Sequence, residues 1–438
     1  FLGGTAGFRV QDQKTQTRLL RSIYQYIKSS GFLCTPQHVQ VLDGGTEAMY
    51  DFAAANIVMR TFEDESIRAV ESFDIGGVST QIGLSSSLRG DDAALGDVLP
   101  LRNVRLGQRD YLFYGHSFLG FGFDEAFYRA IELQTVGSDT SPCLLRGSRH
   151  QTNPQPGSKH HRSLIAGTGD KVECEAIVKR MLSEEVSQFQ AGSHGVAQPF
   201  ELHPHASFAA EAGKIVGFDN MNLIGHVLFR GNIPESVTLV EWESATEAIC
   251  ALSGAELEAS WQSWGGSEVK SSSESCHDSP ICRKVKAACF GGIYMSVLLR
   301  EMSAPGTVQL TISPKIAAFS LNWALGAVVL QLQDLSQAAE SEKEKEKVNA
   351  KSSSGKDAQS AEQNYQRKVD ALAHRKRVDE STSFGFMPRV DYGEIPSETT
   401  DIIARYIMMA LMIPFAWFVW RTCQGTLSTG TIRHDLQD

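Results

Sequence analysis

The chain has 438 residues, of which 42% are hydrophobic and 21% are charged, a balance typical of folded globular proteins and not of disordered chains. Its formal net charge is −10, and it has no basic stripe with interleaved aromatic residues, so general nucleic-acid binding is disfavoured. The length suffices for about two or three domains with packed cores.

The eight cysteines are scattered and include no Cys-x-x-Cys pair, which argues against a zinc ribbon or a thioredoxin-like site. Such scattering fits disulfides in a secreted or luminal protein. It fits equally well reduced, buried thiols in a cytosolic protein. Spacing alone leaves both alternatives open.

The first forty residues predict a strand, a helix and a second strand. The stretch FLGGTAGFRV looks like a strand with a Gly-rich turn; it starts at Phe1, not Met, and no signal peptide precedes it, so we expect a fragment or a processed product. In LLRSIYQYIKSSGF the apolar residues fall on one helical face, and Gly31 supplies a stop. HVQVLD then reads as a strand, so the rhythm favours an α/β fold.

Two acidic residues follow at element ends. Glu47 lies near the start of a helical segment that continues past Asn56. It could accept a proton from a water that attacks a phosphate, or be a helix-start acid favoured by the helix dipole. Asp74 ends an extended segment and precedes Gly76 and Gly77.

The stretch FDIGGVSTQI suits either a phosphate-binding loop or a plain hairpin turn. Gly76 and Gly77 let backbone N–H groups approach a ligand. Ser79 and Thr80 add hydroxyl groups, and Gln81 adds an amide. Asp74 would hold a divalent cation through water. The alternative is a tight turn between two strands. LGGTAGFR, with Thr5 among its glycines, repeats the pattern.

From Ser336 the sequence is rich in Lys, Glu, Ser and Gln, and predicts a solvated linker or stalk with some helical tendency. Residues 402–420 are apolar with one charge, Arg405, and aromatic residues near both ends, as expected of a membrane helix; a buried core helix is the alternative. We therefore divide the chain into a globular region (1–332), a charged low-complexity linker (333–400), a transmembrane helix (401–422) and a short polar tail (423–438).

Read together, the motifs resemble those of the apyrase family, the nucleoside triphosphate diphosphohydrolases. LGGTAGFR, VLDGGTEAMYDFAAAN and FDIGGVSTQI are similar to its second, third and fourth conserved regions, in that order. YLFYGHSFLGFGFDEA, SPCLLRG, GTGDKVEC, AACFGGIYMSVLL and FSLNWALGAVVLQL resemble later elements of the family. The resemblance covers residues 1 to about 332 and implies a two-lobed α/β fold of the ribonuclease-H and actin type.

The resemblance also implies roles for individual residues. Glu47 falls on the catalytic base, and Ser79 and Gln81 on the groups that orient the attacking water. Asp74 falls on the metal-site acid, which holds Ca²⁺ or Mg²⁺ through water. The residues matching phosphate- and nucleotide-binding positions are Thr5, Gly76, Gly77, Val78, Ser79, Thr80 and Trp323.

The sequence departs from the family's pattern at several positions, and the resemblance also suggests disulfide pairs. The family's first conserved region, an Asp-x-Gly-Ser-Ser phosphate loop, has no counterpart after Phe1, so the chain taken alone is expected to lack half of its first lobe's phosphate grip. Ala48 and Asp51 replace usual glycines, and Ala209 and Ala210 stand where tyrosines near the nucleobase are usual. By the same resemblance Cys143 and Cys174 lie in a part usually crosslinked. The remaining suggested pairs are Cys250 with Cys289 and Cys276 with Cys282, while Cys34 has no obvious partner.

The sequence thus predicts a membrane-anchored hydrolase of nucleoside tri- and diphosphates, with its catalytic region on the luminal or extracellular side of the Golgi or cell surface. One alternative is a non-catalytic, membrane-anchored relative that binds nucleotide weakly. Another is a cytosolic actin-like ATPase or sugar kinase, which oxidised cysteines and membrane anchoring would exclude.

Overall fold

The structure is a computed structural model. It describes residues 2–32, 34–64, 66–85, 100–135, 139–151, 164–183, 200, 208, 214–264, 280–312, 315–316, 319–320 and 322–352. The chain forms two compact units, which are described separately. One comprises Phe1–Gly3, Asp12–Gln40 and His374–Asp438, and the other comprises Gly4–Gln11 and Val41–Ala373.

The smaller unit contains the amphipathic helix predicted from the sequence. Helix α2 (Gln13–Ser29) begins after Asp12, whose side chain accepts a hydrogen bond from the Thr15 N–H. It ends just before Gly31, which has a φ of +84°, a conformation that glycine adopts without strain. The predicted helix and its glycine stop are confirmed. The short helix η1 (Pro36–His38) follows.

The strands β1 (Leu2–Gly4) and β2 (Val39–Val41) pair with each other and lead the chain into the larger unit. Both coincide with the predicted strands. In the larger unit, Gly4 continues into helix α1 (Ala6–Arg9), and Val41 continues into helix α3 (Gly44–Val58). The Leu42 N–H donates to the Gly4 carbonyl at 2.8 Å, so these two segments stay together.

A seven-stranded mixed sheet forms the centre of the larger unit, in the order β11-β12-β10-β3-β4-β6-β5. Strands β12, β10 and β3 run parallel, whereas β3, β4, β6 and β5 pair antiparallel in turn. The strands are β3 (Glu71–Ile75), β4 (Ser79–Leu84), β5 (Arg102–Leu106), β6 (Arg109–Leu119), β10 (Lys214–Asp219), β11 (Val237–Thr238) and β12 (Gln309–Thr311).

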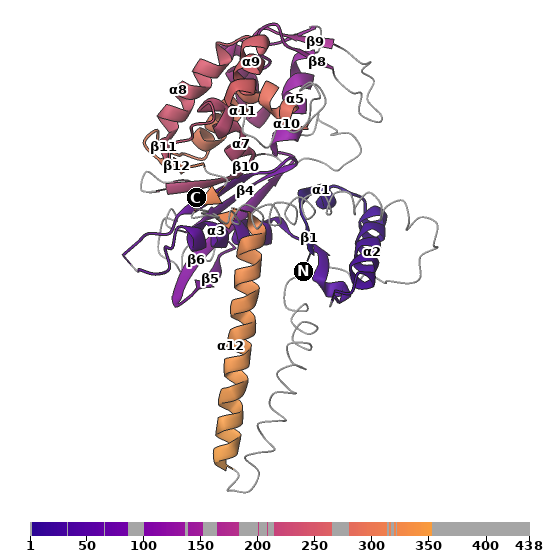
Figure 1. Cartoon of the computed structure of the whole chain (residues 1–438), viewed down its shortest axis with the longest axis vertical. Helices are drawn as coiled ribbons and strands as arrows, with labels where there is room; N and C mark the ends of the chain where they lie inside the picture. The colour runs from indigo at the N-terminus through magenta and orange to yellow at the C-terminus, as the bar shows by residue number, and fades with distance from the viewer. Residues whose placement is uncertain are drawn as a thin grey trace, which may run out of the picture. The chain divides into compact units, whose positions relative to one another are not determined.

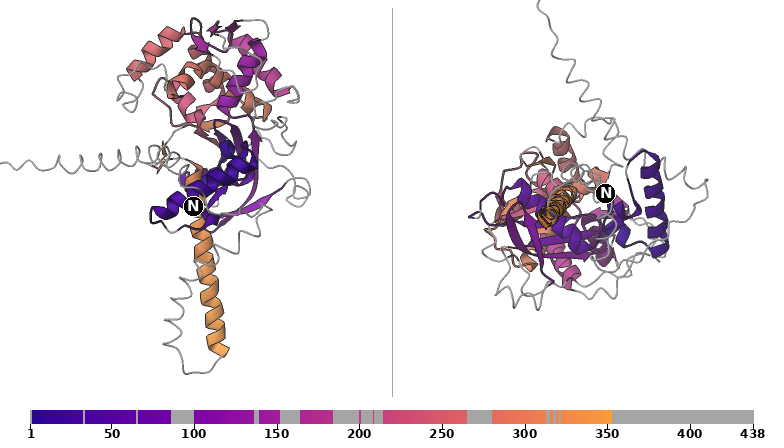
Figure 2. Two further views of the ribbon diagram at one scale, coloured as in Figure 1. Left: turned by 90° about the vertical axis from the view of Figure 1, so that its right-hand side faces the viewer. Right: turned by 90° about the horizontal axis from the view of Figure 1, so that it is seen from below.

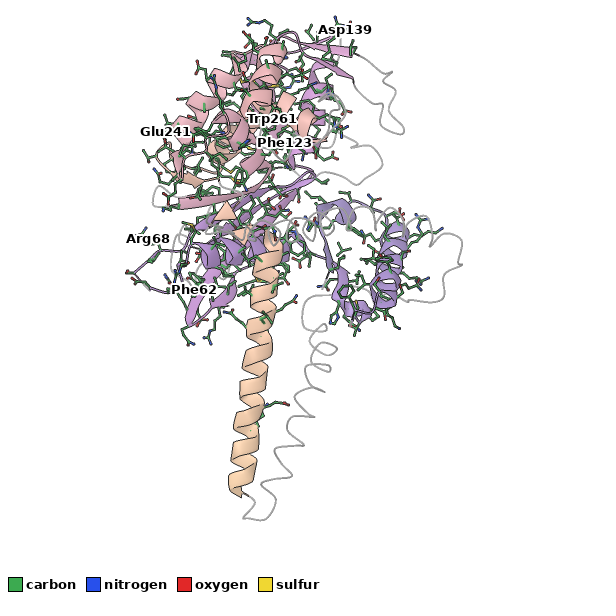
Figure 3. The ribbon with its side chains drawn as sticks, in the orientation of Figure 1. Phe62, Arg68, Phe123, Asp139, Glu241 and Trp261 are labelled. Atoms are coloured by element: carbon green, nitrogen blue, oxygen red, sulfur yellow. A yellow bond between two sulfur atoms is a disulfide. The ribbon has the colours of Figure 1, made fainter. Side chains whose placement is uncertain are left out.

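Helices cover one face of this sheet, over the largest hydrophobic core (Figure 1). They are α5 (Phe123–Thr135), α6 (Lys171–Ser183), α7 (Asn220–Leu228), α8 (Leu239–Cys250), α9 (Gly254–Trp264), α10 (Pro280–Lys286) and α11 (Ala288–Glu301). Figure 3 labels Phe123 and Trp261, both buried, within this layer. The short strands outside the main sheet are β7 (Thr140–Ser141), β8 (Arg149–Gln151), β9 (Leu164–Gly167), β13 (Lys315–Ile316) and β14 (Phe319–Ser320).

Helix α3 covers the opposite face, and helix α12 (Trp323–Ser352) packs on α3. The two helices approach closely at Gly326, where an added Cβ would lie 1.9 Å from the Tyr50 carbonyl oxygen. Figure 2 shows α12 as one continuous helix. It runs through the predicted start of the charged linker at residue 333, because Ala, Glu, Lys and Gln are strong helix formers.

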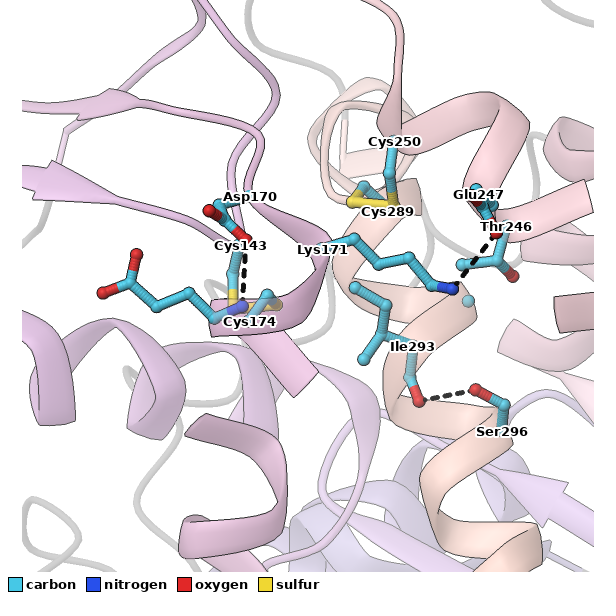
Figure 4. The surroundings of a disulfide bond; sticks show 12 residues. Cys143, Asp170, Lys171, Cys174, Thr246, Glu247, Cys250, Cys289, Ile293 and Ser296 are labelled. Atoms are coloured by element: carbon cyan, nitrogen blue, oxygen red, sulfur yellow. Dashed lines mark hydrogen bonds and ion pairs between the residues drawn. A yellow bond between two sulfur atoms is a disulfide. The ribbon is translucent and has the colours of Figure 1, made fainter. Parts of the chain in front are cut away.

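Two disulfides lie in the α5–α11 layer (Figure 4). Cys143 pairs with Cys174 of α6, and Cys250 at the end of α8 pairs with Cys289 of α11, so both suggested pairs are confirmed. Between them, Lys171 of α6 forms a 3.4 Å ion pair with Glu247 of α8. Cys34 is a free cysteine, and Cys276 lies outside the described residues.

The predicted transmembrane helix (401–422), the polar tail and the linker beyond residue 352 also lie outside the described residues. Within the described part of the chain, no helix is both long enough and apolar enough to span a membrane.

Candidate active site

A row of polar side chains crosses three strands on the face covered by α3. Asp74 of β3 pairs with Gln81 of β4, and Gln81 pairs with Ser117 of β6. Successive residues of a strand point to opposite faces. Asp74, Ser79, Gln81 and Ser117 therefore share one face, while Phe73 and Ile82 enter the core on the other. The predicted hairpin brings four polar groups together beneath α3.

Glu47 reaches this row from the first turn of α3. Helix α3 starts there because the Asp43 side chain caps it, accepting from the Thr46 N–H at 2.9 Å. Glu47 is only 4% exposed. Burial raises the pKa of its carboxyl above the ordinary value, and the neighbouring Arg9 guanidinium opposes that rise. Arg9 thereby favours the ionised carboxylate that a general base requires.

Arg9 links all of these elements. Its Nη1 donates to Glu47 Oε2 at 2.8 Å and to the Leu42 carbonyl at 3.0 Å. Its Nη2 donates to Ser79 Oγ at 3.1 Å and to Ser117 Oγ at 3.2 Å. One guanidinium group thus connects α1, α3, β4 and β6, which fixes the carboxylate relative to the serine hydroxyls.

Gln81 completes the network from the sheet. Its Nε2 lies within hydrogen-bonding distance of Glu47 Oε2 (3.3 Å), Ser117 Oγ (2.9 Å) and Ser79 Oγ. A hydroxyl group accepts two hydrogen bonds and donates one. The Gln81 amide has two N–H protons, so it donates to two of these three acceptors at a time. Arg9 donates to both Ser79 and Ser117, so their hydroxyl protons are available to donate to a ligand. The buried Gln81 Oε1 has no donor among the described residues, so it can accept a hydrogen bond from a bound water.

The Gly loop, residues 76–78, joins β3 to β4 beside this network. Its carbonyl groups are already occupied: Gly76 O accepts from Phe123 N at 2.8 Å, Gly77 O from Asp124 N at 3.0 Å, and Val78 O from Gly120 N at 2.8 Å. The N–H groups of Gly77 and Val78 make no hydrogen bond to another described residue. The loop therefore combines a hairpin turn with free amides, as a phosphate-binding loop requires.

Gly122 supports the loop from behind, since a Cβ there would lie 2.3 Å from Val78 N and 2.4 Å from the Gly77 carbonyl carbon. We expect Gly122→Ala to lower the free energy of unfolding by about 1–3 kcal/mol, because backbone atoms must move apart. Gly7→Ala is the control, since a Cβ at Gly7 meets nothing within 4 Å. Urea unfolding of both variants measures the difference, and equal midpoints would contradict the close packing described here.

Arg9→Ala is expected to lower the free energy of unfolding by about 3 kcal/mol, because the buried Glu47 carboxylate loses its partner. A general base must be ionised, so with Glu47 in that role activity should fall as the pH drops through the Glu47 pKa. Removing the guanidinium raises that pKa, so the acidic limb of the kcat/KM profile should move to higher pH. The control is Arg60→Ala, which breaks an exposed ion pair with Glu63 and should change neither quantity measurably. An unmoved acidic limb would show that Arg9 does not tune Glu47.

Thr5 and Trp323 lie near the two ends of this arrangement. Thr5 is half-buried and precedes α1, and its carbonyl accepts from Phe8 N and from Arg9 N. Trp323 begins α12 and stacks on Tyr50 of α3, with ring centroids 6.3 Å apart. Tyr50 is one helical turn beyond Glu47, so α12 brings Trp323 to the helix that carries Glu47. Their contact with a nucleotide stays a prediction.

Thr80 does not contribute the hydroxyl group expected of it. It lies between Ser79 and Gln81 on β4, so its side chain points to the opposite face. There it is fully buried, and its Oγ1 donates to the Phe121 carbonyl at 2.6 Å. Its hydroxyl group ties the sheet to the segment before α5 instead of facing a ligand.

Asp74 offers acidic oxygen for a divalent cation. It is 4% exposed, and its Oδ1, like Gln81 Oε1, has no donor among the described residues. Burial, with the charges of Asp219 and Glu47, holds the pKa of Asp74 well above its ordinary value. Unpartnered oxygens suit a hard cation with its water ligands. No group of three or more His, Cys, Asp or Glu side chains within the described ranges has a metal-ligating arrangement. That Asp74 holds the cation through water stays a prediction.

The sequence prediction omitted Arg9 and Ser117 as site residues. Both stand within the motifs quoted above, LGGTAGFR and YGHSFLG, so a signal existed. Arg9 contacts Glu47, which lies 38 positions away in the sequence, and Ser117 contacts Gln81, which lies 36 positions away. No local sequence pattern encodes such tertiary contacts. In the segment predicted to lie near the nucleobase, Phe208 is fully buried against Phe73, whereas Ala209 and Ala210 lie outside the described residues.

Comparisons with known proteins identify similar sequences. The model of the GDA1/CD39 (nucleoside phosphatase) family matches residues 1–351. The Golgi apyrase of Schizosaccharomyces pombe is 30% identical over 199 residues, covering 42% of this chain and 33% of that protein. The ectonucleoside triphosphate diphosphohydrolase 6 of Mus musculus is 24% identical over 345 residues, covering 76% of this chain and 65% of that protein. The chain therefore spans about a third to two thirds of these relatives' lengths.

Among solved structures, a nucleoside triphosphate hydrolase from Neospora caninum aligns with a TM-score of 0.49 at 18% identity, covering 75% of this chain and 71% of that one.

Proposed function

Because the chain belongs to the GDA1/CD39 (nucleoside phosphatase) family, we propose that it hydrolyses the terminal phosphate of nucleoside tri- and diphosphates by direct attack of water. The observation that carries the proposal is the buried Glu47 carboxylate, held by Arg9 and Gln81 next to two serine hydroxyls and a loop with free amides. A base, hydrogen-bond donors and an anion-binding loop are the groups that this reaction needs.

In the proposed reaction Glu47 accepts a proton from the attacking water, whose oxygen forms a bond to the terminal phosphorus. The anhydride P–O bond breaks, and its electron pair leaves on the nucleotide, so the products are orthophosphate and a nucleotide shorter by one phosphate. The other O–H group of the water donates a hydrogen bond to Gln81 Oε1, and this hydrogen bond orients the water. Ser79, Ser117 and the amides of Gly77 and Val78 donate to the phosphate oxygens. No phosphoenzyme forms.

Asp74 would hold Ca²⁺ or Mg²⁺, with water completing the coordination shell. A bound divalent cation supplies charge neutralisation for the phosphate groups. We further propose the two-lobed ribonuclease-H-like arrangement for the complete catalytic region, as the resemblance to the apyrases implies.

We also propose that the protein is anchored in a secretory-pathway membrane, in the Golgi or at the cell surface, by residues 402–420, with its catalytic region on the luminal or extracellular side. The apolar sequence of that segment and the two disulfides support this location. Carbonate extraction and protease protection of microsomes test it. Release of the full chain into the soluble fraction would contradict the anchor.

The proposal is tested by phosphate release from ATP, ADP, UDP and GDP by the full-length protein, with Ca²⁺ or Mg²⁺ and with EDTA. We expect phosphate release that requires the cation. Excess unlabelled nucleotide should reduce phosphate release from a labelled nucleotide by competing for the site. Nucleotide binding without any phosphate release would instead favour the non-catalytic relative.

A further inference from the structure

Asp51 is a buried acid that the proposed reaction does not use. It lies on α3 four residues after Glu47, and positions i and i+4 of a helix share one face. Its exposure is 0%, and neither of its carboxylate oxygens has a hydrogen-bond partner among the described residues. A buried carboxylate without partners is costly, so its presence calls for a physical reason.

The sheet beneath Asp51 contributes more unpartnered oxygens. Ser72 and Asp74 of β3 share the sheet face that α3 covers. Ser72 Oγ, Asp74 Oδ1 and Gln81 Oε1 lack hydrogen-bond partners among the described residues, as do both Asp51 oxygens. Helix α3, which carries Asp51, packs on β3, which carries Asp74. Burial raises the pKa of Asp51 well above its ordinary value, and the charges of Asp74 and Glu47 add to that rise. These buried oxygens are all hydrogen-bond acceptors without a donor, so a cation would satisfy them and another acceptor would not.

The charges of this region can be counted. Glu47, Asp51 and Asp74 are three buried carboxylates, and Arg9 forms an ion pair with one of them, Glu47. Asp51 and Asp74 form no ion pair among the described residues, so when both are ionised their two negative charges have no paired cation. One divalent cation would neutralise both.

We propose that Asp51 is a second acidic group of the cation site at Asp74, and that its charge strengthens the binding of Ca²⁺ or Mg²⁺ there. The proposal rests on the proposed metal-dependent function and deepens it. Asp51 acts through the cation and through Asp74 and does not touch the nucleotide, so it is a positioning residue. Groups behind the direct metal ligands change metal affinity by about 10- to 100-fold when removed.

The test measures cation binding without nucleotide, on the full-length protein. Free Mn²⁺ is followed by electron paramagnetic resonance, and Ca²⁺ and Mg²⁺ by competition. We expect Asp51→Asn to weaken Mn²⁺ binding, with a Kd that is higher by about 10-fold or more. Glu71→Gln is the matched control. Glu71 is a buried acid on the same strand as Asp74, but its side chain lies on the opposite face of the sheet. It accepts a hydrogen bond from Ser85 N. This substitution should leave the Kd unchanged.

Thermal unfolding provides a second readout that a purely structural role would not reproduce. Without cation, Asp51→Asn should unfold at the same temperature as the wild type or higher, because a buried unpaired charge is removed. At a fixed Ca²⁺ concentration its gain in Tm should be smaller, because ligand stabilisation follows the ratio of ligand concentration to Kd. Asp51→Ala serves if the Asn variant does not fold.

An unchanged Mn²⁺ Kd in Asp51→Asn would overturn the inference, as would a wild-type protein that binds no Mn²⁺. Phosphate release by the wild type is measured separately, so either failure is distinguishable from failure of the proposed hydrolysis.

Discussion

Phosphate release is expected to fall by about 10²- to 10⁴-fold when Glu47 is replaced by Gln, because the amide cannot accept the proton of the attacking water. The change is small in volume, and the new side-chain oxygen can still accept from Arg9, which now donates to Glu47 Oε2 at 2.8 Å. The network of Arg9, Ser79 and Ser117 should therefore persist. KM for nucleotide should change much less than kcat, since Glu47 is assigned to the chemical step. Steady-state kinetics with ATP and ADP measure both constants.

The control for this variant is Glu63→Gln, which neutralises an exposed acid beyond the end of α3 that pairs with Arg60. It should retain wild-type kcat and KM. Circular dichroism must show that Glu47→Gln is folded. A folded Glu47→Gln variant with wild-type turnover would exclude Glu47 as the base and would leave the proposed mechanism without a proton acceptor.

Removing either disulfide is expected to produce the second large effect, in stability. The bridges close loops with sequence separations of 31 and 39 residues. The chain-entropy model gives about 4 kcal/mol of stabilisation for each such loop. The paired replacement Cys143→Ala with Cys174→Ala should lower the free energy of unfolding by that amount, and so should Cys250→Ala with Cys289→Ala. Urea unfolding under oxidising conditions measures the change.

Cys34→Ala is the matched control, because Cys34 is a free, half-buried cysteine, and its loss should change the free energy of unfolding by less than about 0.5 kcal/mol. Adding a reductant should remove the difference between the wild type and the paired variants. Equal unfolding midpoints for the oxidised wild type and a paired variant would show that the bridge does not form in solution.

Local elements of this fold were predictable because their signals are local. Gly31 marked the end of α2, Glu47 marked the start of α3, and Gly76 with Gly77 marked the β3–β4 turn. The two disulfide pairs followed from the resemblance to a known family, not from spacing.

The remaining features depend on tertiary structure or on strand parity. The contacts of Arg9 join residues up to 108 positions apart, and a sequence pattern does not reveal which carboxylate an arginine will meet. The Thr80 hydroxyl group was assigned to the loop from composition, whereas the alternation of side chains along β4 turns it into the core. The charged segment after residue 333 is predicted to be a linker or stalk with some helical tendency, and helix propensity together with the start of α12 on α3 extends it as a helix to Ser352.

The way the Gly loop is held has a thermodynamic consequence. The Gly76 and Gly77 carbonyl groups accept hydrogen bonds from the first turn of α5, the Val78 carbonyl accepts one from Gly120, and Gly122 packs against the loop backbone. The loop conformation is therefore set by the same contacts that hold the folded unit together. The conformational entropy of ordering these residues is lost when the chain folds and not when an anion arrives. Calorimetry of phosphate binding at the loop should therefore show little ordering penalty.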